Sequence, residues 1–266
     1  MAEEYGFIES KPKSELPIRK LLRVPHREGA LVVGFPAFGP DYFSSNVTKM
    51  GKDYAHPVTG DRISFVEPTT SESISALDYA LQHRTDRSEL DIKRTVLDPN
   101  WLQSGRILRT SEGVFVNPPK DGQGNTIIDD KYLIGLLKGA KPIKIGNANL
   151  YVVGDTDQLK DFAYAEYGTF QGDVQDNTTF AQGGLARALE HTEEPKARKL
   201  ERIASPELYK EGVRVRYFEP VSSPVLRVAV LLSSRDGDWL DVDGSDWYGG
   251  LGCAFGVLDK SPKATQ

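Results

Sequence analysis

The sequence predicts an α+β protein: an antiparallel or mixed β-sheet built from hairpins, with several short helices packed against it. Three observations support this fold class. Segments that read as strands, bounded by Gly, Pro, Asn or Asp, follow one another along the chain as neighbours. Helical patterns are few and short. Strand–helix–strand units, which are typical of a doubly wound parallel sheet, are outnumbered by hairpins.

The chain divides into an arm, a core and a tail. Residues 1–28 form the arm, because they hold three prolines, a basic run and no sustained hydrophobic period. Residues 29–260 form a single α+β core domain, so folding is expected to begin at Gly29. Within the core, residues 190–212 could form a helical connector, and residues 261–266 are a tail.

The first elements of the core are a strand, a long loop, a second strand and a helix. ALVVGF, residues 30–35, is an apolar run closed by Pro36, which predicts a buried strand. DRISFVEP alternates like a strand and leads into a helix over 70–83. Thr69 and Glu72 stand at capping-box spacing before this helix. Three apolar side chains fall on one of its faces: Ile74, Leu77 and Leu81.

The middle of the core predicts two hairpins with a helix between them. GRILRTSEGVFVNPP is expected to turn at 111–113 and PIKIGNANLYVVG at 146–149. DDKYLIGLLKG between them is a helix capped by Asp129 or Asp130 and ended by Gly139. Its residues are apolar on most sides, so we expect it to be buried.

The last part of the core predicts short helices and then strands. LARALEH and PKARKLERIA are helical, and Ser205 with Pro206 begins a further short helix that ends at Gly212. VRVRYFEPV, VLRVAVLLSS, DWLDV and CAFGVL are strands. The Asp-Gly pairs at 236–237 and 243–244 are the dipeptides that type I′ turns prefer, which predicts a three-stranded meander.

The stretch DGDWLDVDGSDW, residues 236–247, holds five aspartates, and tight turns account for three of them. The second turn would set Asp241 opposite Asp246, an unfavourable pair of like charges. Asp241, Asp243 and Asp246 could together hold calcium or magnesium, which would remove this repulsion. A solvated acidic turn and a set of catalytic carboxylates are the alternatives. An EF-hand is excluded because Gly252 occupies the twelfth position of a loop counted from Asp241.

Three other features offer weaker candidate sites. Gly183 and Gly184 precede a predicted helix, whose free N–H groups and dipole could bind an anion such as phosphate. Two glycines can equally separate two segments, and no P-loop spacing follows them. No two of the four histidines have helical ligand spacing, which disfavours zinc. Cys253 is a small buried hydrophobe or, as the alternative, a nucleophile.

The arm combines basic and apolar side chains. Its six lysines and arginines could contact nucleic acid or an acidic protein surface. A nucleic-acid tail would not need the apolar residues, so docking on a protein partner or on another copy of the chain is favoured, with a solvated tail as the alternative. The residues expected to bind the partner are Leu16, Ile18, Arg19, Lys20, Leu21, Leu22 and Arg23.

Composition limits the class of protein and its compartment. The net charge of -5 argues against a nucleic-acid binder that works through a global positive field, which leaves only the basic arm for such contact. A single cysteine cannot form an intramolecular disulfide and fits a reducing compartment. Apolar runs are well short of the roughly 20 residues that span a bilayer. We therefore expect a soluble, cytoplasmic protein without a membrane segment.

Two functions are compatible with these features. The first is a non-enzymatic binding or assembly protein that uses its arm to contact a protein partner or another copy. The alternative is a divalent-cation-dependent hydrolase that uses the acidic hairpin 236–246, with a phosphate near Gly183 and Gly184. No other cofactor is implied. The hydrolase requires the aspartates and the two glycines to converge on one pocket.

Overall fold

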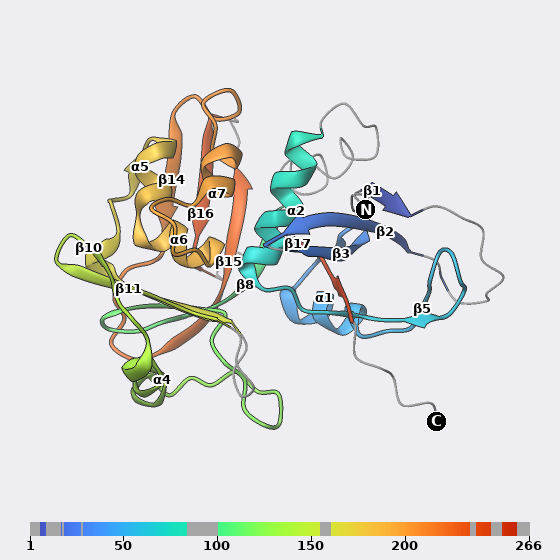
Figure 1. Ribbon diagram of the computed structural model, residues 1–266, viewed down its shortest axis with the longest axis horizontal. Coiled ribbons are helices and arrows are strands. Elements are labelled where there is room, and N and C mark those ends of the chain that lie inside the picture. Colours follow the sequence, from blue (N-terminus) through green and yellow to red (C-terminus); the bar gives the residue numbers. More distant parts are fainter. Residues whose placement is uncertain are drawn as a thin grey trace.

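The computed structural model describes residues 6–8, 17, 19–27, 29–83, 101–154, 161–234, 238–245 and 252–259. Within these residues the chain forms three β-sheets with short helices against them, so the predicted α+β class is confirmed. Figure 1 shows two lobes side by side, with helix α2 (Thr70–Gln82) standing between them. The predicted capping box of this helix is present, formed by Thr69 and Glu72.

The lobe that contains the N-terminus is built on a five-stranded sheet in the order β1-β2-β3-β18-β7. These strands are β1 (Gly6–Ile8), β2 (Lys20–His26), β3 (Gly29–Phe35), β18 (Val257–Leu258) and β7 (Phe65–Val66). The lobe also contains β4 (Phe38–Asp41), α1 (Phe43–Met50), β5 (Tyr54–Ala55) and β6 (Arg62–Ile63). The rings of Phe38, Tyr54 and Phe65 pack edge to face around a small core of this lobe.

Strand β2 lies inside this sheet, which corrects the predicted boundary of the arm. It pairs antiparallel with both β1 and β3. Leu22 and Val24 are buried in the main core and Leu21 in the small core, so both faces of the strand are covered. Folding therefore begins before Gly29. Because both faces are covered, the apolar residues of this strand do not alternate cleanly, and with its basic residues and Pro25 the segment resembles an arm in the sequence.

The second lobe contains most of the large sheet, whose order is β10-β11-β12-β9-β8-β15-β16-β14-β13. Its strands are β8 (Leu102–Arg109), β9 (Gly113–Val116), β10 (Ile143–Ile145), β11 (Ala148–Val153), β12 (Phe162–Glu166), β13 (Val174–Gln175), β14 (Gly212–Arg216), β15 (Val225–Ser233) and β16 (Trp239–Asp243). The pair β14/β16 is parallel. Strand β17 (Gly252–Ala254) joins the two lobes, because it pairs with β4 and with β8.

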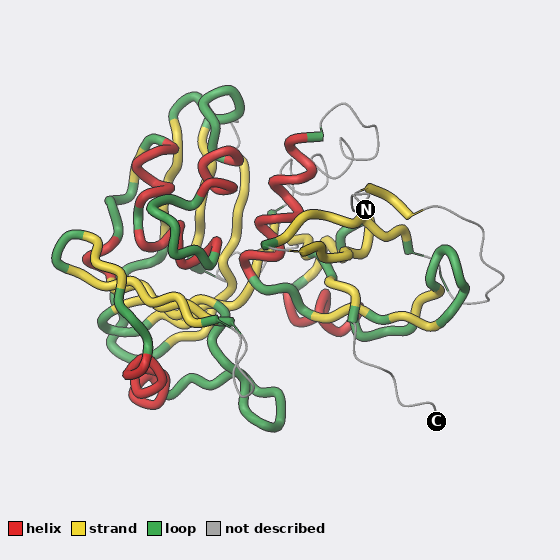
Figure 2. Tube along the Cα trace, viewed as in Figure 1, coloured by secondary structure: helices red, strands yellow, loops and turns green. Residues whose placement is uncertain are grey.

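Helices cover one face of the large sheet. They are α5 (Asn177–Gln182), α6 (Gly184–Glu190) and α7 (Arg198–Ile203), and together with α2 they enclose the main core. Figure 2 shows these three helices grouped in one lobe, whereas the other lobe is mostly strand and loop. Strand β15 displays the difference between the two faces: Ala229 and Leu231 belong to the main core, while Leu226 and Val228 face away from it.

The opposite face of the sheet is covered only at its ends. Helix α4 (Asp130–Leu136), followed by η1 (Leu137–Gly139), packs over one end and forms a third core with β8, β9 and β12. Leu226 packs on this third core, and Val228 packs on the small core of the first lobe. The middle of this face therefore lies between two separate cores.

Several local predictions agree with the structure. The hairpins β8/β9 and β10/β11 form where expected, and Asp129 caps α4 by accepting a hydrogen bond from the Tyr132 backbone N–H. The burial of α4 is corrected, since Tyr132 and Ile134 are exposed. Residues 205–211 form turns instead of the predicted helix, and the segment expected to be a connector buries Leu200 and Tyr209 in the main core.

Of the two hairpins in the predicted three-stranded meander, one is present in the structure. Strands β15 and β16 pair as an antiparallel hairpin, whose turn lies outside the described residues. The second hairpin is wrong, because β16 pairs with β15 and β14 but not with β17. Gly244 is buried without a positive φ, and a Cβ there would lie 2.6 Å from the Tyr217 carbonyl oxygen. Gly244 therefore allows close packing of the two backbones.

In the part of the chain that the structure describes, no helix has the length and apolar character to cross a bilayer.

Candidate functional site

A pocket of about 450 Å³ opens on the face of the large sheet that α5, α6 and α7 leave uncovered. Its floor is the outward column of β15, and the start of α1 forms one wall. Volumes of this size are typical of small-molecule sites. We call it the sheet-face pocket, and the side chains that matter below are Tyr42, Trp101, Arg106, Arg227, Asp243 and Ser245.

The register of three strands sets the polar groups of this pocket on either side of an apolar floor. Val230 of β15 lies opposite Gln103 of β8 and opposite Asp243 of β16. One step along β15 on the same face, Val228 lies opposite Arg106. Because directly opposed residues share a face, the carboxylate and the guanidinium flank the apolar floor from opposite sides.

Asp243 is a buried carboxyl group that lies opposite Arg216 of β14. Only 4% of the residue is exposed, and its Oδ1 accepts one hydrogen bond, of 2.7 Å, from the Ser245 backbone N–H. Burial raises the pKa of the Asp243 carboxyl above its usual range. The hydroxyl of Ser245 is buried beside it, and its interaction with the carboxylate, like the charge of Arg216, opposes the effect of burial on this pKa. Both Asp243 and Ser245 line this end of the pocket.

The β8 side of the pocket is positive. Arg106 Nε lies 2.6 Å from Glu67 Oε1, and Lys120 Nζ lies 3.0 Å from Glu67 Oε2, so two cations share one carboxylate. The Arg106 guanidinium also lies 5.3 Å from the centroid of the Phe43 ring, within cation–π range. Arg227 of β15 also lines the pocket but lies opposite Ile107 of the main core, and it donates a hydrogen bond of 2.9 Å to its neighbour's carbonyl, Leu226 O.

The three aspartates predicted to bind a metal have different surroundings. Asp241 is held by a bidentate ion pair, with Arg214 Nε 2.6 Å from Oδ1 and Nη2 2.9 Å from Oδ2. Asp243 lines the pocket, and Asp246 lies outside the described residues. Among the residues that are described, no three His, Cys, Asp or Glu side chains gather as a metal site. A calcium or magnesium site here stays a prediction, and it would have to compete with Arg214 for Asp241.

Gly183 and Gly184 do not converge with the aspartates. Helix α6, which they begin, packs on the face of the sheet that carries Leu240 and Val242. Asp241 and Asp243 alternate with these residues and therefore point to the opposite face. Both glycines are buried, and a Cβ at Gly184 would overlap the Thr169 hydroxyl. Close packing accounts for Gly184 without a bound anion.

This packing can be tested by two glycine-to-alanine substitutions. Gly184→Ala is expected to destabilise the protein by about 1–3 kcal/mol, because the added methyl group overpacks against Thr169. Gly135→Ala in α4 is the control: nothing lies within 4 Å of its Cβ position, so the better helix propensity should stabilise by up to about 1 kcal/mol. Urea denaturation measures both. Unchanged stability of Gly184→Ala, with altered phosphate binding, would restore the anion site.

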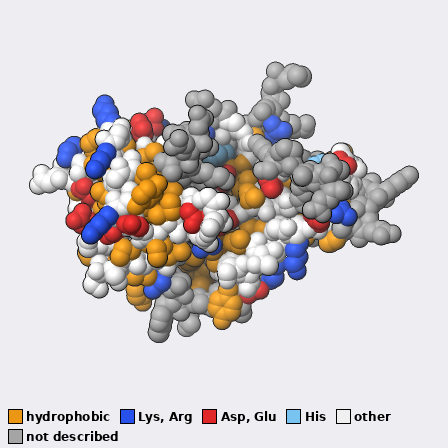
Figure 3. Space-filling view, turned by 90° about the horizontal axis from the view of Figure 1, so that it is seen from below, with side chains coloured by type: hydrophobic (Ala, Val, Ile, Leu, Met, Phe, Trp, Pro, Cys, Tyr) orange, Lys and Arg blue, Asp and Glu red, His pale blue; other side chains and the backbone are white. Residues whose placement is uncertain are grey.

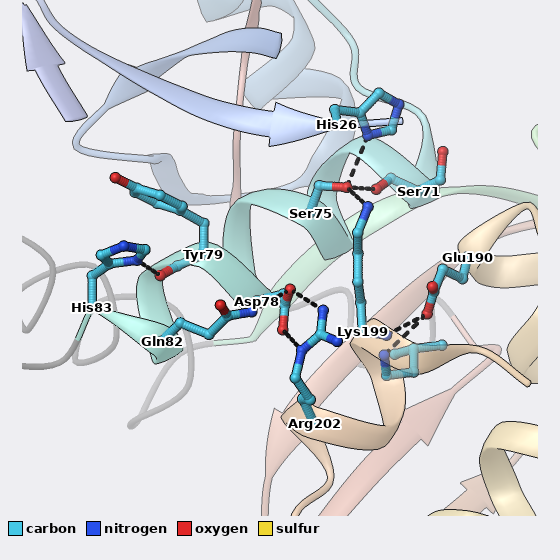
Figure 4. A network of polar contacts seen from close by, with 11 residues as sticks. His26, Ser71, Ser75, Asp78, Tyr79, Gln82, His83, Glu190, Lys199 and Arg202 are labelled. Carbon is cyan, nitrogen blue, oxygen red and sulfur yellow. Dashed lines mark hydrogen bonds and ion pairs between the residues drawn. The ribbon is translucent and has the colours of Figure 1, made fainter. Parts of the chain in front are cut away.

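A network of polar contacts joins the two lobes along α2 (Figure 4). Ser75 is its centre: Lys199 Nζ donates to Ser75 Oγ at 2.7 Å, and His26 Nδ1 lies 2.8 Å from the same oxygen. Asp78 receives two hydrogen bonds from Arg202, of 3.0 and 2.7 Å. We call this network the polar seam, and its members are His26, Ser75, Asp78, Glu190, Lys199 and Arg202.

The polar seam resembles a serine–lysine arrangement, but its hydroxyl is fully used. Ser75 donates to the Ser71 carbonyl at 2.9 Å and accepts from Lys199 and His26, which is the full capacity of one hydroxyl. The serine is 2% exposed. Burial lowers the pKa of Lys199, and burial together with the charge of Lys199 lowers that of His26 to about 4. The seam therefore joins the lobes as a structural contact.

The residues expected to bind a partner are largely committed to the fold. Leu21 and Leu22 are buried, and Arg23 is half-buried. The Arg19 guanidinium donates to the Pro36 carbonyl and lies 3.8 Å from the centroid of the Phe38 ring. Lys20 is exposed, while Leu16 and Ile18 lie outside the described residues.

The sequence analysis singled out Asp243 but missed its companions in the pocket. Arg106 and Val230 come from strands far apart in the chain, and no local motif joins them.

No protein-family model, curated protein or solved structure matches this chain. On the face drawn in Figure 3, basic and acidic side chains are interspersed, and no continuous basic surface is seen among the described residues.

Proposed function

We propose that this chain is a binding protein whose ligand occupies the sheet-face pocket, with a hydrogen-bond-donating, preferably cationic, group at Asp243. The observation that carries the proposal is a buried carboxyl group that lines a pocket and accepts one hydrogen bond. A buried charge that is incompletely hydrogen-bonded is costly, and a ligand that brings a donor reduces this cost. The buried Ser245 hydroxyl, which lines the same end of the pocket, supports the same orientation.

The apolar floor supports a ligand with a flat or aliphatic body. Val228, Val230 and Leu232 line the pocket from β15, and Trp101 and Phe43 line it from the sides. A largely apolar lining with a few polar groups is typical of small-molecule sites. The ligand is thus a small molecule with an apolar body and a polar head.

The pocket favours this binding role over the hydrolase. That enzyme needs Asp241 free for a metal and the glycines near the aspartates, whereas Asp241 is paired with Arg214 and the glycines begin a helix on the other face. Assembly through the arm remains a separate proposal. It would depend on residues other than Leu21 and Leu22, which are buried.

Three probes of one size test the head-group preference. Benzamidine, benzamide and benzoate share a phenyl ring and differ in charge. We expect benzamidine to bind about tenfold more tightly than benzamide, because its hydrogen bonds to a carboxylate are charge-assisted, and benzoate to bind least. The preference should decline as the pH falls through the raised pKa of Asp243, since the neutral acid no longer attracts a cation. Ligand-observed NMR titrations measure the affinities.

Asp243→Asn provides the decisive variant. It keeps the shape of the side chain and should abolish the preference for benzamidine over benzamide. Asp61→Asn is the matched control, because it changes the net charge equally at an exposed position between β5 and β6. Equal binding of all three probes to the wild type, or an unchanged preference in Asp243→Asn, would contradict the proposal.

A further inference from the structure

We infer that the sheet-face pocket binds a mononucleotide, preferably one carrying guanine, with the edge of the base at Asp243 and Ser245 and the phosphate toward Arg106. The inference rests on the proposed function and names its ligand class. It follows from the distance between the two charged sides of the pocket, from the aromatic side chains near them, and from the hydrogen-bonding capacity of the carboxylate.

The charged groups stand far apart. Asp243 and Arg106 lie on strands that flank β15 on its two sides, so two strand spacings, about 10 Å, separate their backbones. Apolar side chains of β15 fill the interval. A ligand that engages both sides needs a donor head and an anionic tail at opposite ends of an apolar body. An α-amino acid does not meet this requirement, because a single carbon separates its two charges.

A nucleotide has a donor head and an anionic tail at opposite ends and so meets this requirement. The hydrogen-bonding edge of the base and the phosphate lie at opposite ends of the molecule, with the flat base and the sugar between them. Arg106 shares Glu67 with Lys120, which leaves this cluster with a net positive charge. Guanidinium groups suit phosphate because they offer a planar fork of donors.

Aromatic side chains are placed to contact the base. Tyr42 is 56% exposed at the start of α1, and Trp101 precedes β8; both line the pocket. Bases commonly stack on such rings in single-nucleotide sites. The net charge of the chain does not oppose this ligand, because one phosphate needs only a local cationic group and no extended basic surface.

The hydrogen-bonding pattern selects guanine. The side-chain amide of Gln103 is already engaged, since it accepts from Asn46 at 2.9 Å and donates to the Asp41 carbonyl at 3.1 Å. Reading of the base therefore falls to Asp243 and Ser245. An ionised carboxylate only accepts, and guanine presents two neighbouring donors on one edge. Uracil presents a single N–H between two carbonyl oxygens, which a carboxylate would repel.

Competition against bound benzamidine tests the inference with GMP, UMP and guanosine. For the wild type we expect GMP to bind at least about tenfold more tightly than UMP and than guanosine, as the loss of a charge-assisted contact predicts. Asp243→Asn should remove the difference between GMP and UMP but keep that between GMP and guanosine. Arg106→Gln should do the reverse. Thermal unfolding verifies that each variant is folded.

The outcomes separate the inference from the function on which it rests. If benzamidine binds through Asp243 but GMP competes no better than UMP, the nucleotide is wrong and the binding function stands. If benzamidine itself fails to bind, both are wrong. If Arg106→Gln retains the advantage of GMP over guanosine, the phosphate does not lie on the β8 side, and the inferred orientation is overturned.

Discussion

Deletion of residues 1–28 is expected to abolish cooperative folding of the remaining chain. The deletion removes β2, which pairs with β3 from Lys20 to His26 and buries Leu21, Leu22 and Val24. Each fully buried aliphatic side chain contributes roughly 1.5–3 kcal/mol. Three of them, together with a seven-residue ladder, are comparable to the total stability of a typical domain, about 5–15 kcal/mol. Circular dichroism and urea denaturation would show a chain without a cooperative transition.

Two single substitutions on the same strand give this result a control. Leu22→Ala should cost about 2–5 kcal/mol, because the fully buried side chain leaves a cavity in the main core. Lys20→Ala, at an exposed position two residues earlier, should change stability by about 0.5 kcal/mol or less. A truncated chain that keeps its secondary structure and forms a smaller assembly in light scattering would refute the role of β2 and restore the arm.

Features encoded by adjacent residues could be predicted from the sequence. The capping box of Thr69 and Glu72, the cap at Asp129 and the hairpin at 146–147 each depend on a few neighbouring positions, and each is present. Helix α1 was missed because the N-cap position holds Tyr42, which makes no side-chain cap bond. Local chemistry therefore predicts elements well where the signal is a cap or a turn.

Features set by distant partners could not be predicted in this way. The parallel pairing of β14 with β16 brings Arg214 opposite Asp241, and no residue spacing in the sequence predicts this pairing. The resulting ion pair uses the carboxylate that a metal would have needed. Asp243 shares the same strand and face but lies between Val230 of β15 and Arg216 of β14 and lines the pocket, so two carboxylates of one acidic segment have different surroundings.

Acid is expected to destabilise the protein steeply between about pH 6.5 and pH 4, through two buried histidines. Burial is the main cause that lowers the pKa of His26 and of His191 from 6.5 to about 4. The cations that face His26 are Lys199 and Arg27, and Asp161 opposes them; His191 faces the same Asp161 and Arg27. Arg27 is already ion-paired with Asp161, which limits what this carboxylate can offer a protonated histidine.

The direction in which stability changes with pH depends on whether the folded or the unfolded chain binds more protons. Between pH 4 and 6.5 the unfolded chain holds protons on these histidines that the folded chain excludes, so stability rises with pH in this window and is lost as the pH falls. Each shift corresponds to at most roughly 3 kcal/mol. Burial raises the pKa of Glu190, so its contribution has the opposite sign and offsets part of the loss. Above pH 6.5 the histidines of the unfolded chain lose their remaining protons, so this dependence fades out over about one further pH unit.

His191→Asn removes one of the two titrating rings, together with the charge that a protonated His191 exerts on His26. His191 ends α6 with a φ of 55°, and asparagine tolerates this left-handed conformation better than most residues, so the variant removes the titrating ring without adding backbone strain. Urea denaturation at pH 7.5, 6.5, 5.5 and 4.5 should show that wild type loses more stability across the window than His191→Asn, by up to roughly 3 kcal/mol. His83→Asn is the control, because His83 is exposed at the end of α2, and its profile should follow the wild type. If all three proteins lose the same stability over this range, protonation of His191 is not what couples the fold to pH.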